Sequence, residues 1–303
     1  MRLKQTEKHN KNTVTKIRVS FVIFVLLFVA VLVTVPLMLK SLYPSASDIV
    51  IKRAMAESLK KNANDLTKDD FAKITKLHIS NKDISNIRLL KRFTNLDELY
   101  LTGINIRKSA LPKWMSILEK IHLINQSDKD SIDLSPLEKL TNLKTLYISG
   151  KGIKNIEPIK NLSNLINLNI SDTEISDIKS IKDLPNLEYL TLWHSQVTDL
   201  KQIKNFKKLR VLNLSESQTL DLKPLLELEN LKMLSIFGNI SFFQINPGNS
   251  SIMENGNIDF ETIKKLKTLE TLNLTNSVLS KEQQEDLQKA NPNLKIGVGY
   301  VSN

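Results

Sequence analysis

An apolar residue at positions 0, +3 and +5 recurs along most of this chain, with a period near 22 residues. The clearest copy places Leu165, Leu168 and Ile170 at these positions. A single unit of this length cannot close a hydrophobic core, whereas units stacked on one another can. The pattern therefore predicts a solenoid of short strands, which favours a binding surface over an active site.

A fixed period of about 20–29 residues with the spacing L-x-x-L-x-L is the signature of leucine-rich repeats. The copies start at Ile74, Leu96, Leu118, Leu143, Leu165, Leu187, Leu209, Leu231 and Leu269, with a partial copy at Leu294. The spacing widens to 25 residues after Leu118 and to 38 after Leu231. The sequence thus predicts an α/β leucine-rich repeat solenoid (horseshoe) of about nine 22-residue repeats over residues 74–303, with an insertion near 239–259.

The N-terminus has the features of a membrane anchor. Residues 19–39 form a run of 21 residues without a formal charge, long enough for a helix to span about 31 Å, which matches a hydrocarbon core. Residues 1–18 carry six basic side chains and only Glu7, so the positive-inside rule keeps them cytoplasmic. We expect a cytoplasmic tail, a single transmembrane anchor and an extracellular repeat domain. A cleaved signal peptide, with Ser45-Ala46-Ser47 as the cleavage region, is the alternative.

Residues 40–73 are expected to form a linker and a helical cap. A helix should start at Ser47-Asp48 and run to about Lys61, and Thr67 with Asp70 suggests a capping box for a second, short helix. The first strand of a solenoid otherwise exposes an apolar end, so a cap is required there. The basic positions of the first helix leave a location on the membrane surface open as an alternative.

Strand alternation identifies the side chains that face a partner. The leucines of each strand point into the core, so positions +2, +4 and +6 point to the opposite, concave face. The candidates on or beside this face are Tyr100, His122, Tyr147, Tyr189, Trp193, His194 and Phe237. With strands about 4.8 Å apart, Tyr100, His122 and Tyr147 are expected to form a continuous strip. Exposed aromatic residues are typical binding anchors, although aromatic cross-strand pairs also stabilise sheets.

The insertion near 239–259 contains two adjacent aromatic residues, Phe242 and Phe243. Long loops in compact domains are often functional. These rings are expected to pack either on a partner or on the flank of the solenoid itself, because exposed apolar pairs are unfavourable on a soluble surface.

The sequence contains no recognisable catalytic or cofactor-binding motif. With no cysteine, it has no disulfide and no thiol chemistry, and its histidines lack metal-ligand spacing. The net charge is +11, of which +5 lies in residues 1–39, and no concentrated basic stripe indicates nucleic-acid binding. We therefore expect no cofactor and no metal. An enzyme that uses the 239–259 loop as part of a pocket is the least favoured alternative.

The repeats also carry Asn or Asp at +12, an aliphatic residue at +13 and Asn before the next leucine, as in Asp177, Ile178 and Asn186. Together with the segment Asp65 to Ser80, this pattern resembles the internalin-like group of bacterial leucine-rich repeat surface proteins over about residues 47–300. The resemblance implies surface exposure and binding through the concave face, often to another protein. Because an LPxTG-type sorting motif is lacking, we expect a membrane-anchored module that binds a protein or glycan. A secreted or wall-associated adhesin or effector is the alternative.

Overall fold

A computed structural model describes residues 46–80, 84, 87–104, 131–217, 221–236, 259–274 and 279–298. The chain divides into two compact units, Met1–Ala46 and Ser47–Asn303, and the description below concerns the second. The predicted tail, the anchor at 19–39, His122, Phe237, Phe242 and Phe243 lie outside the described residues. Of the helices within the described ranges, none has the length and apolar character needed to cross a membrane.

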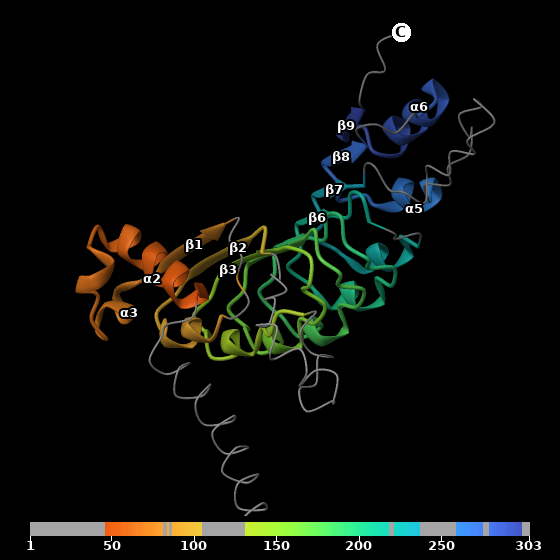
Figure 1. Ribbon diagram of the computed structural model, residues 1–303. Coiled ribbons are helices and arrows are strands. Elements are labelled where there is room, and N and C mark those ends of the chain that lie inside the picture. Colours follow the sequence, from red (N-terminus) through yellow and green to blue (C-terminus); the bar gives the residue numbers. More distant parts are fainter. Residues whose placement is uncertain are drawn as a thin grey trace, which may run out of the picture. The chain divides into compact units, whose positions relative to one another are not determined.

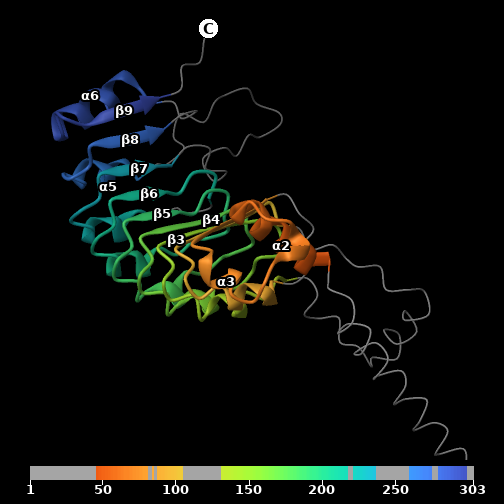
Figure 2. The ribbon, with the colours of Figure 1, turned by 90° about the vertical axis from the view of Figure 1, so that its left-hand side faces the viewer.

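The unit Ser47–Asn303 is built on one parallel sheet of nine strands that follow one another in chain order. Figure 2 shows this succession from β3 to β9. The strands are β1 Lys76–Ser80, β2 Glu98–Thr102, β3 Thr145–Ser149, β4 Asn167–Ser171, β5 Tyr189–Thr191, β6 Val211–Asn213, β7 Met233–Ser235, β8 Thr271–Leu274 and β9 Lys295–Val298. Equivalent residues pair in register, for example Leu168 with Leu146 and Leu190. This confirms the predicted solenoid and its register.

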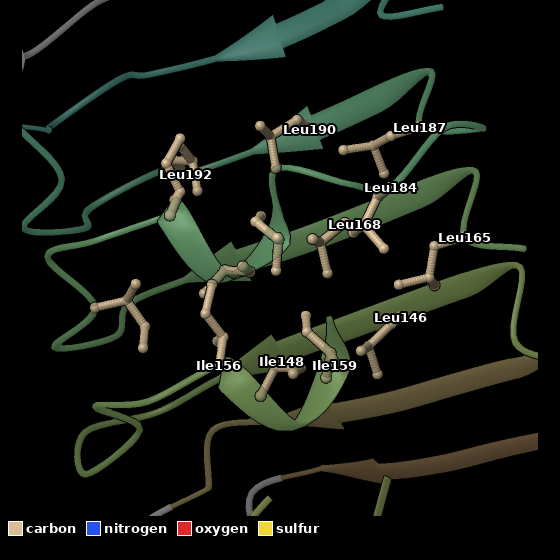
Figure 3. Close-up of a cluster of buried hydrophobic side chains, with 14 of the residues drawn as sticks. Leu146, Ile148, Ile156, Ile159, Leu165, Leu168, Leu184, Leu187, Leu190 and Leu192 are labelled. Carbon is tan, nitrogen blue, oxygen red and sulfur yellow. The ribbon is translucent and has the colours of Figure 1, made fainter. Parts of the chain in front are cut away.

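Short helices return the chain to the next strand on the side opposite the sheet (Figure 1). They are the 3-10 helices η2 Arg88–Arg92, η3 Ser135–Leu137, η4 Glu157–Ile159, η5 Lys179–Ile181, η6 Lys201–Asn205 and η7 Lys223–Glu227, and the α-helix α5 Phe260–Lys265. The core lies between the two sides. Leu146, Leu168 and Leu190 stack in it from successive strands and are at most 1% exposed (Figure 3).

Two recurrent polar side chains bond the turns of the repeats. At +12, Asp177 Oδ1 accepts from the Lys179 N–H at 2.6 Å and so starts the 3-10 turn. Immediately before most repeats, an asparagine donates to a carbonyl of the preceding one, as Asn164 Nδ2 does to Thr141 O at 2.8 Å. This side-chain to backbone bond between successive repeats, called the ladder bond below, is also made by Asn95, Asn142, Asn186 and Asn230. Asn291 makes a similar bond. These bonds satisfy backbone oxygens where no strand or helix partner exists.

The N-terminal end is closed by the helical cap that the sequence predicts. It consists of α2 Ala46–Leu59, η1 Ala63–Asp65 and α3 Asp70–Lys73. Ile51 and Met55 of α2 are fully buried against the solenoid core. The Thr67–Asp70 pair forms, with Asp70 Oδ2 accepting from both the N–H and the hydroxyl of Thr67, but α3 begins at Asp70 after Asp69, so the expected capping box around Thr67 is wrong.

At the C-terminal end, the helix α6 Lys281–Ala290 precedes β9. Its first turn has a complete capping box, in which the Ser280 hydroxyl accepts from the Gln283 N–H and the Gln283 side chain accepts from the Ser280 N–H. Leu287 of α6 is buried in the core. The partial copy predicted at Leu294 therefore contributes the last strand of the sheet.

The repeat predicted to start at Leu118 does not stand between its neighbours, because β2 pairs directly with β3. The repeat that starts at Leu96 is completed by residues 131–142, where Asp133 Oδ1 accepts from the Ser135 N–H as Asp177 does in its own repeat. The segment 105–130 is thus an insertion within the Leu96 repeat.

Leu118 matches the repeat pattern only in part. The apolar spacing fits, and Asp130 stands at +12. However, Ile117 precedes Leu118 where most copies have the ladder asparagine, and Ser131 stands at +13 where the regular copies have an aliphatic residue. The copy at Leu118 thus lacks the asparagine that bonds a repeat to the preceding one. It also lacks the aliphatic residue at +13 that packs in the core next to the turn.

Candidate binding surface

The side of the sheet that faces away from the core is here called the open face. Its side chains are those at +2, +4 and +6 of each strand, which alternate with fully buried ones, as in β1 and β2. Within a column, neighbouring side chains stand on adjacent strands about 4.8 Å apart. The open face therefore presents three parallel rows of side chains, most of them at least partly exposed, although Thr145, Ser171, Ser215 and Ser235 within these rows are buried.

Three rings at +4 form a stack on the open face over β1 to β3. The rings of His78 and Tyr100 have centroids 4.0 Å apart, and those of Tyr100 and Tyr147 are 4.7 Å apart, with interplanar angles of 26° and 25°. The prediction that Tyr100 and Tyr147 share a strip is confirmed. The prediction that His122 lies between them is wrong, because β2 and β3 are direct neighbours.

An ion pair lies beside this stack at +2. Lys76 Nζ is 2.6 Å from Glu98 Oε1, and this contact raises the pKa of Lys76. The Tyr100 hydroxyl donates to Glu98 Oε2 at 3.4 Å. Partial burial, and then the nearby Glu98 carboxylate, raises the pKa of Tyr100. The hydroxyl therefore stays protonated at physiological pH and donates its hydrogen to Glu98.

A second cluster of large side chains lies over β5 to β7 at +2. Tyr189 pairs in register with Val211, and Val211 with Met233. Tyr189 is 41% exposed and Met233 is 38% exposed, so the two ends of this row of three apolar side chains are accessible to a partner. The sequence predicted Tyr189 but not Val211 or Met233, because only aromatic residues and histidines were taken as candidates. Aliphatic residues at +2 of consecutive repeats were the signal that would have identified them.

Trp193 and His194 follow β5 at +6 and +7. Trp193 is half-buried, and its ring centroid lies 5.8 Å from that of His194. His194 Nδ1 is 2.5 Å from Asp172 Oδ1 of the preceding repeat. His194 and Asp172 both have left-handed backbones, with φ of 51° and 53°. The left-handed turn thus directs an exposed His–Asp pair to the rim beside Trp193.

Charged residues at +1 line the other rim and neutralise one another across strands. Asp97 pairs with Lys144 at 3.5 Å and Glu188 with Arg210 at 3.8 Å. Glu270 lies 2.8 Å from Lys232, which lowers the pKa of Glu270. This rim carries no block of one sign. It therefore lacks the single-sign field that nucleic-acid binding requires.

The predicted site residues fall into separate groups. Tyr100 and Tyr147 stack together, whereas Tyr189 begins β5 and Trp193 lies in the turn that follows β5. His78, absent from the predicted set, extends the first group. Among the residues that the structure covers, no group of three or more His, Cys, Asp or Glu side chains is arranged to hold a metal ion.

Comparison with known proteins agrees with this architecture. A family model described as leucine-rich repeats (two copies) matches residues 163–205. The solved structure of internalin C2 from Listeria monocytogenes aligns with a TM-score of 0.58 at 21% identity, over 86% of this chain and 95% of that chain. InlF, an internalin of the same organism, aligns with a TM-score of 0.53 at 21% identity, over 86% and 69%. No curated protein matches the sequence. The described part of the chain thus has a leucine-rich repeat fold, similar to that of the Listeria internalins.

Proposed function

We propose that this chain is a binding protein that recognises a partner protein through the open face of its sheet. The observation that carries the proposal is the exposure of large side chains on a face that the fold does not need. Tyr189 and Met233 remain more than one third exposed, although their neighbours Leu190 and Leu234 are fully buried. Exposed aromatic and methionine side chains are enriched in the centres of protein interfaces. Structural similarity to the internalins and the repeat architecture both fit a binding module.

A protein partner suits the first group of rings better than a glycan does. Sugars stack on free aromatic faces, whereas Tyr100 lies between His78 and Tyr147 with both of its faces occupied. What this stack offers to a partner is ring edges and phenol hydroxyls. These groups suit a protein surface that supplies side-chain acceptors and apolar contacts.

We also propose that residues 19–39 anchor the chain in a membrane, with residues 1–18 cytoplasmic and the repeats outside. The support is the charge-free run of 21 residues and the basic tail before it. Protease added to intact cells without a wall should then degrade the repeat domain and leave the tail. Release of a shortened chain into the medium would instead support a cleaved signal peptide, and protection until lysis would contradict the topology.

Affinity capture by residues 41–303 is the experiment that tests the binding proposal. Trp193→Ala and Tyr147→Ala, one from each group of rings, should each lower the affinity for the captured protein at least about tenfold. Leu226→Ala is the matched control, since Leu226 is 44% exposed on η7 at the opposite side. Unchanged affinity in both ring variants would exclude the open face. Unfolding of both would show that the rings are structural.

A further inference from the structure

We propose that the open face over β4 to β6 binds a proline-rich segment of a partner protein in the polyproline II conformation. The inference rests on the proposed function, because it assumes that this face binds protein, and it adds the chemistry of the segment. The +4 residues Asn169, Thr191 and Asn213 of these three strands are called the amide strip below. Tyr189 at +2 lies on one side of the strip, and Trp193 at +6 lies on the other.

The two asparagines of the amide strip are oriented by bonds within their own repeats. Asn169 Oδ1 accepts from the Ser171 hydroxyl at 2.5 Å, and Asn213 Oδ1 accepts from the Ser215 N–H at 2.9 Å. Each amide oxygen is thus engaged, and each Nδ2 forms no hydrogen bond with any residue that the structure places. Both residues are half-buried. The strip therefore presents two oriented N–H donors to a partner.

The spacing of these donors selects the conformation of the segment. Asn169 pairs with Thr191, and Thr191 with Asn213, so the donors are two strand intervals, or about 9.6 Å, apart. A polyproline II helix has three residues per turn and rises about 3.1 Å per residue, so equivalent carbonyls repeat every ~9.3 Å. In a β-strand, carbonyls on one side repeat every ~6.7 Å, and those of an α-helix are already bonded within the helix. A polyproline II segment lying across the strands satisfies both donors.

Aromatic residues beside the strip supply contacts for proline rings. Tyr189 is 41% exposed and has no aromatic ring stacked on it among the described residues, whereas Tyr100 lies between two rings. Val211 and Met233 continue the apolar row from Tyr189. Aromatic side chains next to hydrogen-bond donors are the general means of binding proline-rich segments, whose carbonyls stay unbonded and whose chain loses little entropy.

The test is a titration of the full chain, purified in detergent, with a dodecaproline peptide and a Gly-Ser peptide of the same length. Dodecaproline should bind saturably and the Gly-Ser peptide should not. The double variant Asn169→Asp with Asn213→Asp keeps both internal acceptors and removes both donors, so it should weaken binding about tenfold or more. Tyr189→Ala should weaken it too. The control is Asn205→Asp, which makes the same chemical change at the exposed end of η6.

Absence of saturable dodecaproline binding, or equal binding by the double variant, would overturn the inference. Saturable binding of chitohexaose, lost in Tyr189→Ala while dodecaproline fails to bind, would assign the strip to a glycan. If dodecaproline fails to bind but the open-face variants still lose a captured protein partner, the proposed function stands and only this inference falls.

Discussion

The rings of Tyr100 and Tyr147 stack with centroids 4.7 Å apart, although 47 positions separate the two residues in the chain. The contact exists because β2 and β3 are direct neighbours in the sheet. A stack of this kind contributes about 0.5–1.5 kcal/mol beyond its buried area. The first group of rings on the open face therefore forms only if β2 pairs with β3, although residues 105–130 separate the two strands in the sequence.

Removal of residues 105–130 should leave the solenoid folded. Both ends of the segment are fixed to the same turn, since the Ile104 N–H donates to Ser149 O at 2.9 Å and the Ile132 N–H to Gly152 O at 2.8 Å. A chain in which a short Gly-Ser linker replaces 105–130 should unfold cooperatively in urea at a midpoint close to the parental one. Deletion of 131–142, which carries η3, should abolish that transition. Loss of folding in the first variant would place essential core contacts within 105–130.

Gly150→Ala should be strongly destabilising. Its φ is 141°, and an added Cβ would lie 2.0 Å from the backbone oxygen of Ile104, so backbone must move. Strain of this kind costs about 1–3 kcal/mol or more. Gly297→Ala is the matched control, because its Cβ would meet nothing closer than 3.7 Å. Urea unfolding should separate the two variants clearly, and equal midpoints would show that the close approach of Ile104 to Gly150 is not required.

Leu190→Ala should cost about 2–5 kcal/mol of unfolding free energy, as for other fully buried leucines. Leu190 is 0% exposed and stands between Leu168 and Leu212 in the central column. Thr191→Ala changes the next residue, which faces the open side, and should alter stability by less than about 0.5 kcal/mol. Chemical denaturation measures both. A larger effect from Thr191 than from Leu190 would contradict the register of β5.

Asp70 makes the stability of the cap dependent on pH. Its carboxylate accepts hydrogen bonds from Lys61, from the Thr67 N–H and from Lys73, and these hold its pKa well below the usual 3.8. A lowered pKa stabilises the fold above the unfolded-state pKa, and this stabilisation is lost as the pH falls below about 3.8 towards the folded-state pKa. Asp70→Asn should therefore lower Tm at pH 7, and its difference from the parent should shrink below pH 4. Asp69→Asn, at an exposed neighbour, should do neither.

The repeat fold could be predicted because several independent signals coincide in each regular copy. In the structure, Leu165 is buried in the core, Asp177 bonds the turn, and Asn186 makes the ladder bond to the preceding repeat. Each residue has the role that its position in the repeat predicts. Leu118 shows what happens when only some of the signals are present. Apolar spacing with an acidic residue at +12 does not distinguish a strand from an insertion, because leucines at these intervals satisfy many local structures.

Part of the candidate site was also readable from the sequence. Strand alternation placed Tyr100, Tyr147 and Tyr189 on the open face, since the period of two is fixed by backbone geometry. The amide strip was not readable in this way. The free donor of Asn213 depends on which of its two amide atoms bonds to the Ser215 N–H, and that is decided by side-chain rotation after folding. Met233 was missed for a different reason, because its position at +2 could be read from the repeat but only aromatic residues and histidines were considered.

The in-register pairing of β3, β4 and β5 means that each unit meets the next through equivalent contacts. A duplication of residues 165–186 in frame would offer Leu187 the same partners that it has now. Duplication or deletion of whole repeats would therefore lengthen or shorten the open face by one strand at a time. Partner size can then be matched in evolution by copying a unit, with the cap and α6 left unchanged at the two ends.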